Sequence, residues 1–122
     1  MTLLNIITAV KERFPSADAK DICRLVNELE SRLNDEIFSP FKIECSKRKL
    51  DVKSDMNTPL FLGEENISLY VYFIYSILSL EESDFECSSI FSTVFNKKFS
   101  ELAAAYRRNH LPRKNTLLKG DF

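Results

Sequence analysis

The chain is poor in glycine and histidine, two residue types on which many binding and catalytic motifs depend. It has 2 glycines in 122 residues, and neither Gly63 nor Gly120 lies in a glycine-rich pattern. Loops that cradle phosphates need glycine where the backbone approaches the anion, so no nucleotide site of that type is expected. The single histidine, His110, has no serine, cysteine or carboxylate at the spacing of a catalytic motif. We therefore predict no catalytic residue, no cofactor and no enzyme activity.

Cysteines are also few, and their spacing argues against a zinc site and a disulfide framework. Cys23, Cys45 and Cys87 are odd in number, lie far apart and form no Cys-x-x-Cys pair. We expect three reduced thiols and no metal site. The acidic pairs Glu64-Glu65 and Glu81-Glu82 lie near predicted helix starts, where negative charge stabilises the helix dipole.

The sequence has neither an excess of positive charge nor a long apolar run. The formal net charge is −1 and the sequence pI is about 5.9, so no global positive field favours general binding to nucleic acid. The longest apolar run, residues 67–80, contains three serines and is shorter than the roughly 20 residues of a membrane-spanning helix. We expect no membrane span, and the first residues predict a short helix rather than a signal peptide.

Apolar residues instead recur at three- and four-residue steps, as in amphipathic helices. This pattern predicts a first helix that ends near Arg13 and a second that starts after Ser16 or Asp18 and ends before Ser39-Pro40. The apolar stripes of these two helices, and hence part of the expected core, are Leu3, Ile6, Ile7, Val10, Ile22, Leu25, Val26, Leu29, Leu33 and Ile37.

Two further helices are expected in the second half of the chain. The run 67–80 predicts a third helix that is apolar nearly all round. A fourth helix over 84–108 follows a capping-box signature of Ser83 and Glu86. Its expected core face consists of Phe91, Phe95, Phe99, Leu102 and Tyr106.

The helical period disappears over residues 39–66. Apolar and polar residues alternate there over short spans, which favours two brief strands. The alternating apolar positions are Phe41, Ile43, Cys45, Leu50 and Val52. The expected fold is therefore mainly α: a small four-helix bundle-like domain over residues 1–112, with an irregular or short β-hairpin insertion between helices 2 and 3. Residues 113–122 are expected to form a flexible C-terminal tail.

Positive charge gathers in two places. Lys47, Arg48 and Lys49 fit either a solvated turn or a contact with an anionic partner surface or DNA phosphates. Arg107 and Arg108 lie where cations complement a helix C-terminus. Further cations follow that helix, at Arg113, Lys114 and Lys119.

Three tyrosines of the third predicted helix fit two environments. The spacing of Tyr70, Tyr72 and Tyr75 spreads their hydroxyls around the helix. Tyrosine is favoured at interfaces that are part apolar and part wet. Both a core position and a subunit interface therefore remain open for these residues.

Several motifs resemble one family, the small head–tail connector (adaptor) proteins of tailed bacteriophages and prophages. Asn27-Glu28-Leu29 with Arg32 matches a turn of the family's N-terminal half. Leu60-Phe61-Leu62 and Tyr70-Val71-Tyr72-Phe73 match its short apolar strand and aromatic helix. The end of its last helix is matched by Phe95-Asn96, Tyr106, His110 and Pro112. These motifs cover about half of the chain, and none is catalytic.

The resemblance implies a structural role in the virion, at the head–tail junction, after assembly in the bacterial cytoplasm. Such a subunit forms a ring of about twelve copies beneath the portal protein, extends the channel for packaged DNA and supports tail-side completion proteins. It places Arg107, Arg108, His110, Arg113 and Lys114 at the portal. The alternative is a small helical DNA-binding or regulatory protein of phage or prophage origin, which only the two basic clusters favour.

Overall fold

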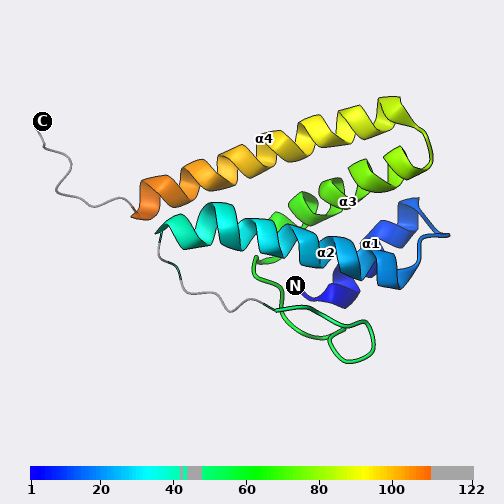
Figure 1. Cartoon of the computed structure of the whole chain (residues 1–122), viewed down its shortest axis with the longest axis horizontal. Coiled ribbons are helices and arrows are strands. Elements are labelled where there is room, and N and C mark those ends of the chain that lie inside the picture. Colours follow the sequence, from blue (N-terminus) through cyan, green and yellow to red (C-terminus); the bar gives the residue numbers. More distant parts are fainter. Residues whose placement is uncertain (42, 44–47, 111–122) are drawn as a thin grey trace, which may run out of the picture.

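Helices make up most of residues 1–41, 43 and 48–110, the part of the chain that the computed structural model describes. The four α-helices are α1 (Leu3–Arg13), α2 (Ala19–Leu33), α3 (Ile67–Glu81) and α4 (Phe85–His110) (Figure 1). A π-helical turn (Asn34–Phe38) and a 3-10 turn (Ser39–Phe41) extend α2, and a second 3-10 turn (Glu64–Asn66) precedes α3. The mainly helical character predicted from the sequence agrees with this architecture. The predicted tail, 113–122, lies outside the described residues.

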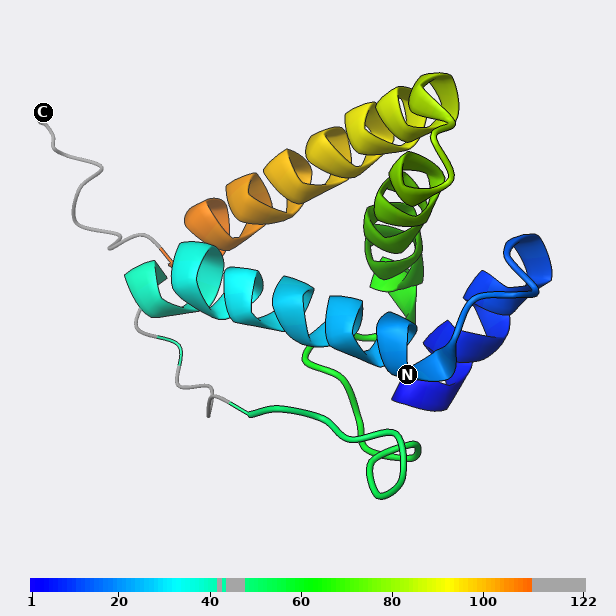
Figure 2. The same cartoon turned by 45° about the vertical axis from the view of Figure 1, so that its right-hand side comes forward.

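The axes of α2, α3 and α4 form the sides of a triangle in Figure 2, and α1 lies outside the corner between α2 and α3. α3 and α4 meet at a tight turn in which Ser83 has a positive φ of 61°. The far end of α4 returns to the end of α2, where the ring centroids of Phe38 and Tyr106 are 5.6 Å apart. The axes of these three helices therefore diverge, whereas the helix axes of a four-helix bundle lie nearly parallel or antiparallel.

Helix starts follow local capping signals. Thr2 caps α1, and the carboxylate of Asp18 caps α2. The predicted Ser83 cap of α4 is wrong, because the left-handed φ of Ser83 closes the turn instead. The carboxylate of Asp84 caps α4 by accepting a hydrogen bond of 3.2 Å from the backbone N–H of Cys87.

The core lies on one face of each helix. Every residue of the predicted α1 and α2 stripes is buried, and Ile37 continues the α2 stripe into the π-helical turn. Phe95 and Phe99 of α4 are buried, whereas the rest of the predicted α4 stripe is half-buried. On α3 the buried hydrophobic residues are Leu69, Tyr70, Ile74 and Leu78. Removing these apolar side chains from water stabilises the fold by about 25 cal/mol per Å² buried.

The predicted β-hairpin between helices 2 and 3 is wrong, since the described part of 39–66 contains no strand. One isolated β-bridge there joins Pro59 to Thr2. The alternation has another origin: Leu50, Leu60 and Leu62 are buried against the helices. Side chains of α2, rather than a second strand, bind the backbone of this segment.

Candidate functional site

The buried carboxylate of Glu30 on α2 binds residues of the segment 48–62 and of α3. Glu30 lies on α2 and is 2% exposed. Its Oε2 accepts a hydrogen bond of 2.8 Å from the backbone N–H of Phe61 and one of 2.9 Å from the hydroxyl of Tyr70 on α3. Its Oε1 lies 3.1 Å from Nη2 of Arg48. A buried carboxylate is tolerated here because both of its oxygens have donors.

Arg48 is one of the three cations of the predicted loop interface, and it is engaged within its own chain. Besides its ion pair, its Nη2 donates a hydrogen bond of 2.8 Å to the carbonyl of Pro59. Its guanidinium also lies 4.4 Å from the ring centroid of Phe61, a cation–π distance. Of the other two cations, Lys49 is exposed and Lys47 lies outside the described residues.

Asn27 of α2 also binds the segment 48–62, through the backbone of Leu50. Its Oδ1 accepts a hydrogen bond of 2.8 Å from the backbone N–H of Leu50, and its Nδ2 donates one of 3.1 Å to the Leu50 carbonyl. The thiol of Cys23 donates to that carbonyl at 3.3 Å. Burial raises the pKa of Cys23, so the thiol stays protonated and acts as a structural donor rather than a nucleophile.

A groove of about 330 Å³ lies between α2 and this segment, and we name it the basic groove. Lys20, Arg24 and Lys49 supply its positive charge. Its other lining residues are Cys23, Asn27, Leu50, Asp51 and Val52. The groove thus combines cations with apolar side chains.

The three tyrosines of the predicted subunit interface have different environments. Tyr70 is 0% exposed and belongs to the core. Tyr72 and Tyr75 are half-buried, and their ring centroids lie 5.8 Å and 5.2 Å from that of Phe91 on α4. The guanidinium of Arg13 lies 4.9 Å from the same Phe91 ring. Of the three tyrosines, Tyr72 and Tyr75 are therefore the ones that offer surface to a second molecule.

The cations of the predicted portal contact lie at and beyond the end of α4. Arg107 and Arg108 are exposed. The side chain of His110, together with Arg113 and Lys114, lies outside the described residues. A groove of about 570 Å³ runs beside this end of α4, between the helix and residues 61–66.

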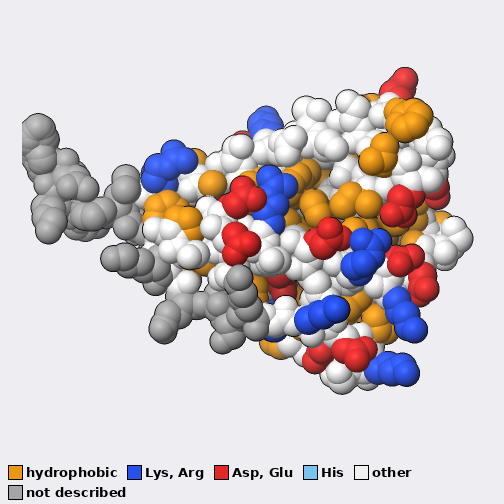
Figure 3. Space-filling model, viewed as in Figure 1, with side chains coloured by type: hydrophobic (Ala, Val, Ile, Leu, Met, Phe, Trp, Pro, Cys, Tyr) orange, Lys and Arg blue, Asp and Glu red, His pale blue; other side chains and the backbone are white. Residues whose placement is uncertain are grey.

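Sequence reasoning missed an exposed tip where α3 turns into α4. Leu80, Phe85 and Ile90 are 53%, 66% and 55% exposed. The exposed carboxylates between and beside them belong to Glu81, Glu82, Asp84 and Glu86. Figure 3 shows hydrophobic side chains on the surface at this turn, at the upper right. The signal in the sequence is Phe85, an aromatic residue at a helix start and off the stripe that begins at Phe91.

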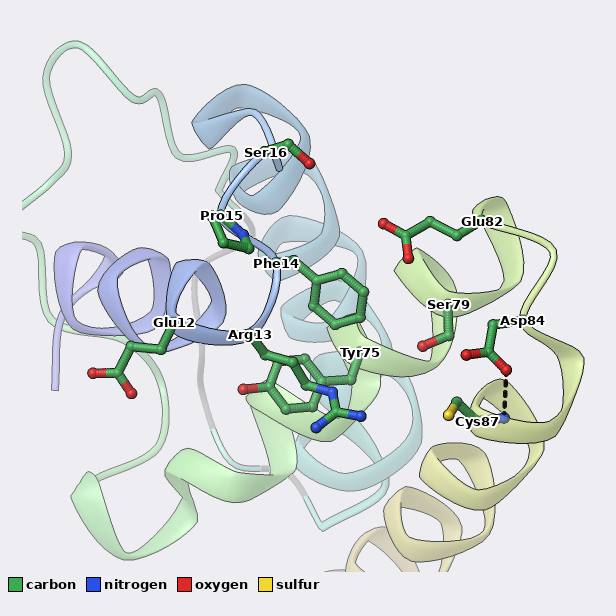
Figure 4. Close-up of a pocket in the computed structure, with 10 residues that line it drawn as sticks. All are labelled: Glu12, Arg13, Phe14, Pro15, Ser16, Tyr75, Ser79, Glu82, Asp84 and Cys87. Atoms are coloured by element: carbon green, nitrogen blue, oxygen red, sulfur yellow. Dashed lines mark hydrogen bonds between the residues drawn. The ribbon is translucent and has the colours of Figure 1, made fainter.

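Beside the tip, a groove of about 700 Å³ lies between the end of α1 and the start of α4 (Figure 4). Cys87 and Asp84 lie close together on its α4 side. Hydrogen bonding to Asp84 raises the pKa of the Cys87 thiol, which is the opposite of what a nucleophilic cysteine requires. The hydrogen bond from the Cys87 backbone N–H lowers the pKa of Asp84 and keeps it ionised. This groove offers a charged surface rather than an acid–base pair.

The described ranges 1–41, 43 and 48–110 contain neither a cluster of metal-ligating side chains nor a helix that could span a membrane. No three histidine, cysteine, aspartate or glutamate residues come together there as metal ligands. None of the helices in these ranges is both long and apolar enough to cross a membrane.

Comparisons of the chain with protein-family models, curated proteins and solved structures find no match. The tip is apolar and acidic, whereas the basic groove combines cations with apolar side chains.

Proposed function

We propose that the chain is a structural subunit of a phage or prophage head–tail connector. It assembles as a ring beneath the portal, extends the DNA channel and joins the capsid to tail-side proteins. The motifs that resemble the connector family support this proposal. The observation that carries it is the exposed tip, Leu80, Phe85 and Ile90, on a small helical chain, because clustered exposed apolar side chains mark protein interfaces.

The distribution of charge along α4 also supports assembly. The helix has 26 residues and is about 39 Å long. Its first turn adjoins the acidic tip, whereas Arg107 and Arg108 are exposed on its last turns. A ring joins unlike surfaces of neighbouring subunits, so a subunit with chemically different ends suits that symmetry. In this proposal the basic end contacts the portal, together with His110, Arg113 and Lys114.

The proposal is tested by mixing the purified chain with the portal protein encoded by the same phage or prophage and measuring co-sedimentation. We expect a portal-bound ring, and we expect Arg107→Glu with Arg108→Glu to abolish it. Lys97→Glu, an exposed change farther back on α4, is the matched control and should bind normally. A chain that stays apart from the portal at every ratio contradicts the proposal. Salt-sensitive retention on DNA without portal binding would favour the DNA-binding alternative.

A further inference from the structure

We propose that the tip of one copy docks into the basic groove of a second copy, with Phe85 as the anchor. This inference rests on the proposed function, because it names the contact between neighbouring subunits of the ring. The occupant follows from the chemistry of the chain itself, in which an acidic, apolar protrusion and a basic, partly apolar groove are both present.

The tip has the composition of a hydrophobic anchor with an acidic surround. Phe85 is 66% exposed, and Asp84 and Glu86 flank it directly. Residues 78–90 contain four carboxylates and no lysine or arginine. Two such tips would repel each other, because like charges brought together across an interface disfavour the contact. A basic surface therefore suits this tip better than a second copy of the tip does.

The basic groove has a charge opposite to that of the tip and is large enough for the Phe85 ring. Lys20, Arg24 and Lys49 supply cations beside the apolar side chains of Leu50 and Val52. Its volume of about 330 Å³ lies at the lower end of the range for small-ligand pockets, about 300–1,000 Å³, and so admits one aromatic ring.

The groove is lined by three cations and one carboxylate, and Asp55 nearby adds a second negative charge; after burial, Asp51 and Asp55 both raise the pKa of the Cys23 thiol. The carboxylate of Asp51, the one acidic residue of the lining, accepts a hydrogen bond of 2.9 Å from the backbone N–H of Lys53 in its own turn. Arg24 pairs with Glu28 at 3.0 Å and lies 4.0 Å from Glu81, but all three side chains are more than half exposed. Such surface pairs contribute at most about 1 kcal/mol, so a docked carboxylate can compete for Arg24.

The tip and the groove are formed by different elements. The tip is the turn between α3 and α4, whereas the groove lies between α2 and the segment at the bottom of Figure 1. One copy can therefore insert its tip into a neighbour and receive the tip of another. Contacts of this heterologous kind close into rings when the rotation between copies allows it.

Charge reversal tests the contact in solution. Glu82→Lys with Glu86→Lys brings the net charge of the tip to zero, because Glu81 and Asp84 remain, and Lys20→Glu with Lys49→Glu makes the groove acidic; all four substituted positions are exposed. We expect the wild-type chain to self-associate in sedimentation velocity and each double variant to remain monomeric on its own. An equimolar mixture of the two variants should form heterodimers, because the unchanged tip of the groove variant then finds the unchanged groove of the tip variant. Circular dichroism establishes that both variants are folded.

The anchor is tested separately. Phe85→Ser should weaken self-association by at least about tenfold, as for a central interface residue. Leu4→Ser is the matched control, an exposed apolar residue on α1 that should have no effect. Unchanged association of Phe85→Ser, or double variants that form no heterodimer on mixing, overturns the inference.

Portal binding, measured in parallel, distinguishes this inference from the proposed function. A wild-type chain that binds the portal but never associates with itself, alone or on the portal, overturns the docking contact and leaves the connector function standing. A chain that self-associates through Phe85 but ignores the portal supports the contact and overturns the connector function.

Discussion

The hydroxyl of Tyr70 donates a hydrogen bond of 2.9 Å to Oε2 of Glu30, and the two side chains are 0% and 2% exposed. The same carboxylate binds Phe61 and Arg48, so three segments distant in sequence meet at one residue. Removing Glu30 would leave the buried hydroxyl of Tyr70 and the backbone N–H of Phe61 without this acceptor. That loss exceeds the net contribution of the bond itself.

Glu30→Gln should therefore destabilise the fold strongly. It removes the charge that pairs with Arg48, whose side chain is 28% exposed, and it weakens the hydrogen bonds that three residues donate to a charged group, so the cost should be about 2–3 kcal/mol. Tyr70→Phe removes a single hydroxyl and should cost about 1–2 kcal/mol. Urea unfolding followed by circular dichroism measures both. The control is Glu28→Gln, which breaks a half-exposed pair and should change stability by less than about 1 kcal/mol. Equal stability of the Glu30 and Glu28 variants would contradict the prediction.

Arg48→Ala and Lys49→Ala, at neighbouring positions, should have different effects. Arg48 binds Glu30 and the Pro59 carbonyl, so its loss should lower stability by about 1–3 kcal/mol. It should also speed thermolysin cleavage near Leu50. Lys49 is exposed, and its loss should change stability by no more than about 0.5 kcal/mol. Indistinguishable cleavage rates for the two variants would show that Arg48 does not hold the segment.

The predictability of each element depended on where its binding partners lie in the sequence. The α1 stripe from Leu3 to Val10 was predicted correctly, because helical periodicity is a local signal. The segment 48–62 was not, since its partners are Asn27 and Glu30, both of which read as ordinary polar positions of α2. The alternation of apolar and polar residues around Leu50 shows which side chains are buried. It does not show whether they are buried against helices or within a sheet, because both give the same alternation.

The candidate surfaces were predictable to a lesser extent. Arg48 and Lys49 are adjacent and chemically alike in the sequence, yet one is tied to a buried carboxylate and the other is exposed. Tyr70 and Tyr72 differ in the same way. Which side chain is covered depends on packing between distant segments. The exposed tip around Phe85 was not predicted from the sequence, because its carboxylates also fit a local role in stabilising a helix start.

Alkaline pH should weaken the fold through Tyr70. Burial, followed by the charge of Glu30, raises the pKa of Tyr70 above its usual value of 10.0. The folded chain then keeps a proton that the unfolded chain releases. Stability is therefore fully present below about pH 10 and falls above it, by up to about 1.4 kcal/mol per pH unit from this group. Tyr70→Phe should remove this component.

Urea midpoints measured between about pH 9 and pH 11 test this slope. The comparison variant is Tyr75→Phe. Burial also raises the pKa of Tyr75, but this residue is only half-buried, so its removal should flatten the curve less. A Tyr70→Phe curve parallel to the wild-type curve would contradict the assignment.

Arg24 and Arg32 of α2 both form ion pairs with a glutamate four residues later, but only Arg32 also lies over an aromatic ring. Arg24 pairs with Glu28 at 3.0 Å, and Arg32 pairs with Glu36 at 2.8 Å. The guanidinium of Arg32 also lies 4.4 Å from the ring centroid of Phe99 on α4. This cation–π contact joins two sides of the helical triangle, and Arg32 should therefore contribute more to stability than Arg24.

Arg32→Gln should destabilise the fold by about 1 kcal/mol more than Arg24→Gln. Arg24→Gln loses only exposed ion pairs, with Glu28 and, at 4.0 Å, with Glu81. By contrast, Arg32→Gln loses its exposed pair and also the contact with the Phe99 ring. A double-mutant cycle of Arg32→Gln with Phe99→Leu isolates that contact and should give a coupling of about 0.5–1 kcal/mol. Arg32→Lys should recover only part of it, since an ammonium lacks the planar face that stacks on the ring. Additive effects in the cycle would mean that α2 and α4 are held together by apolar packing alone.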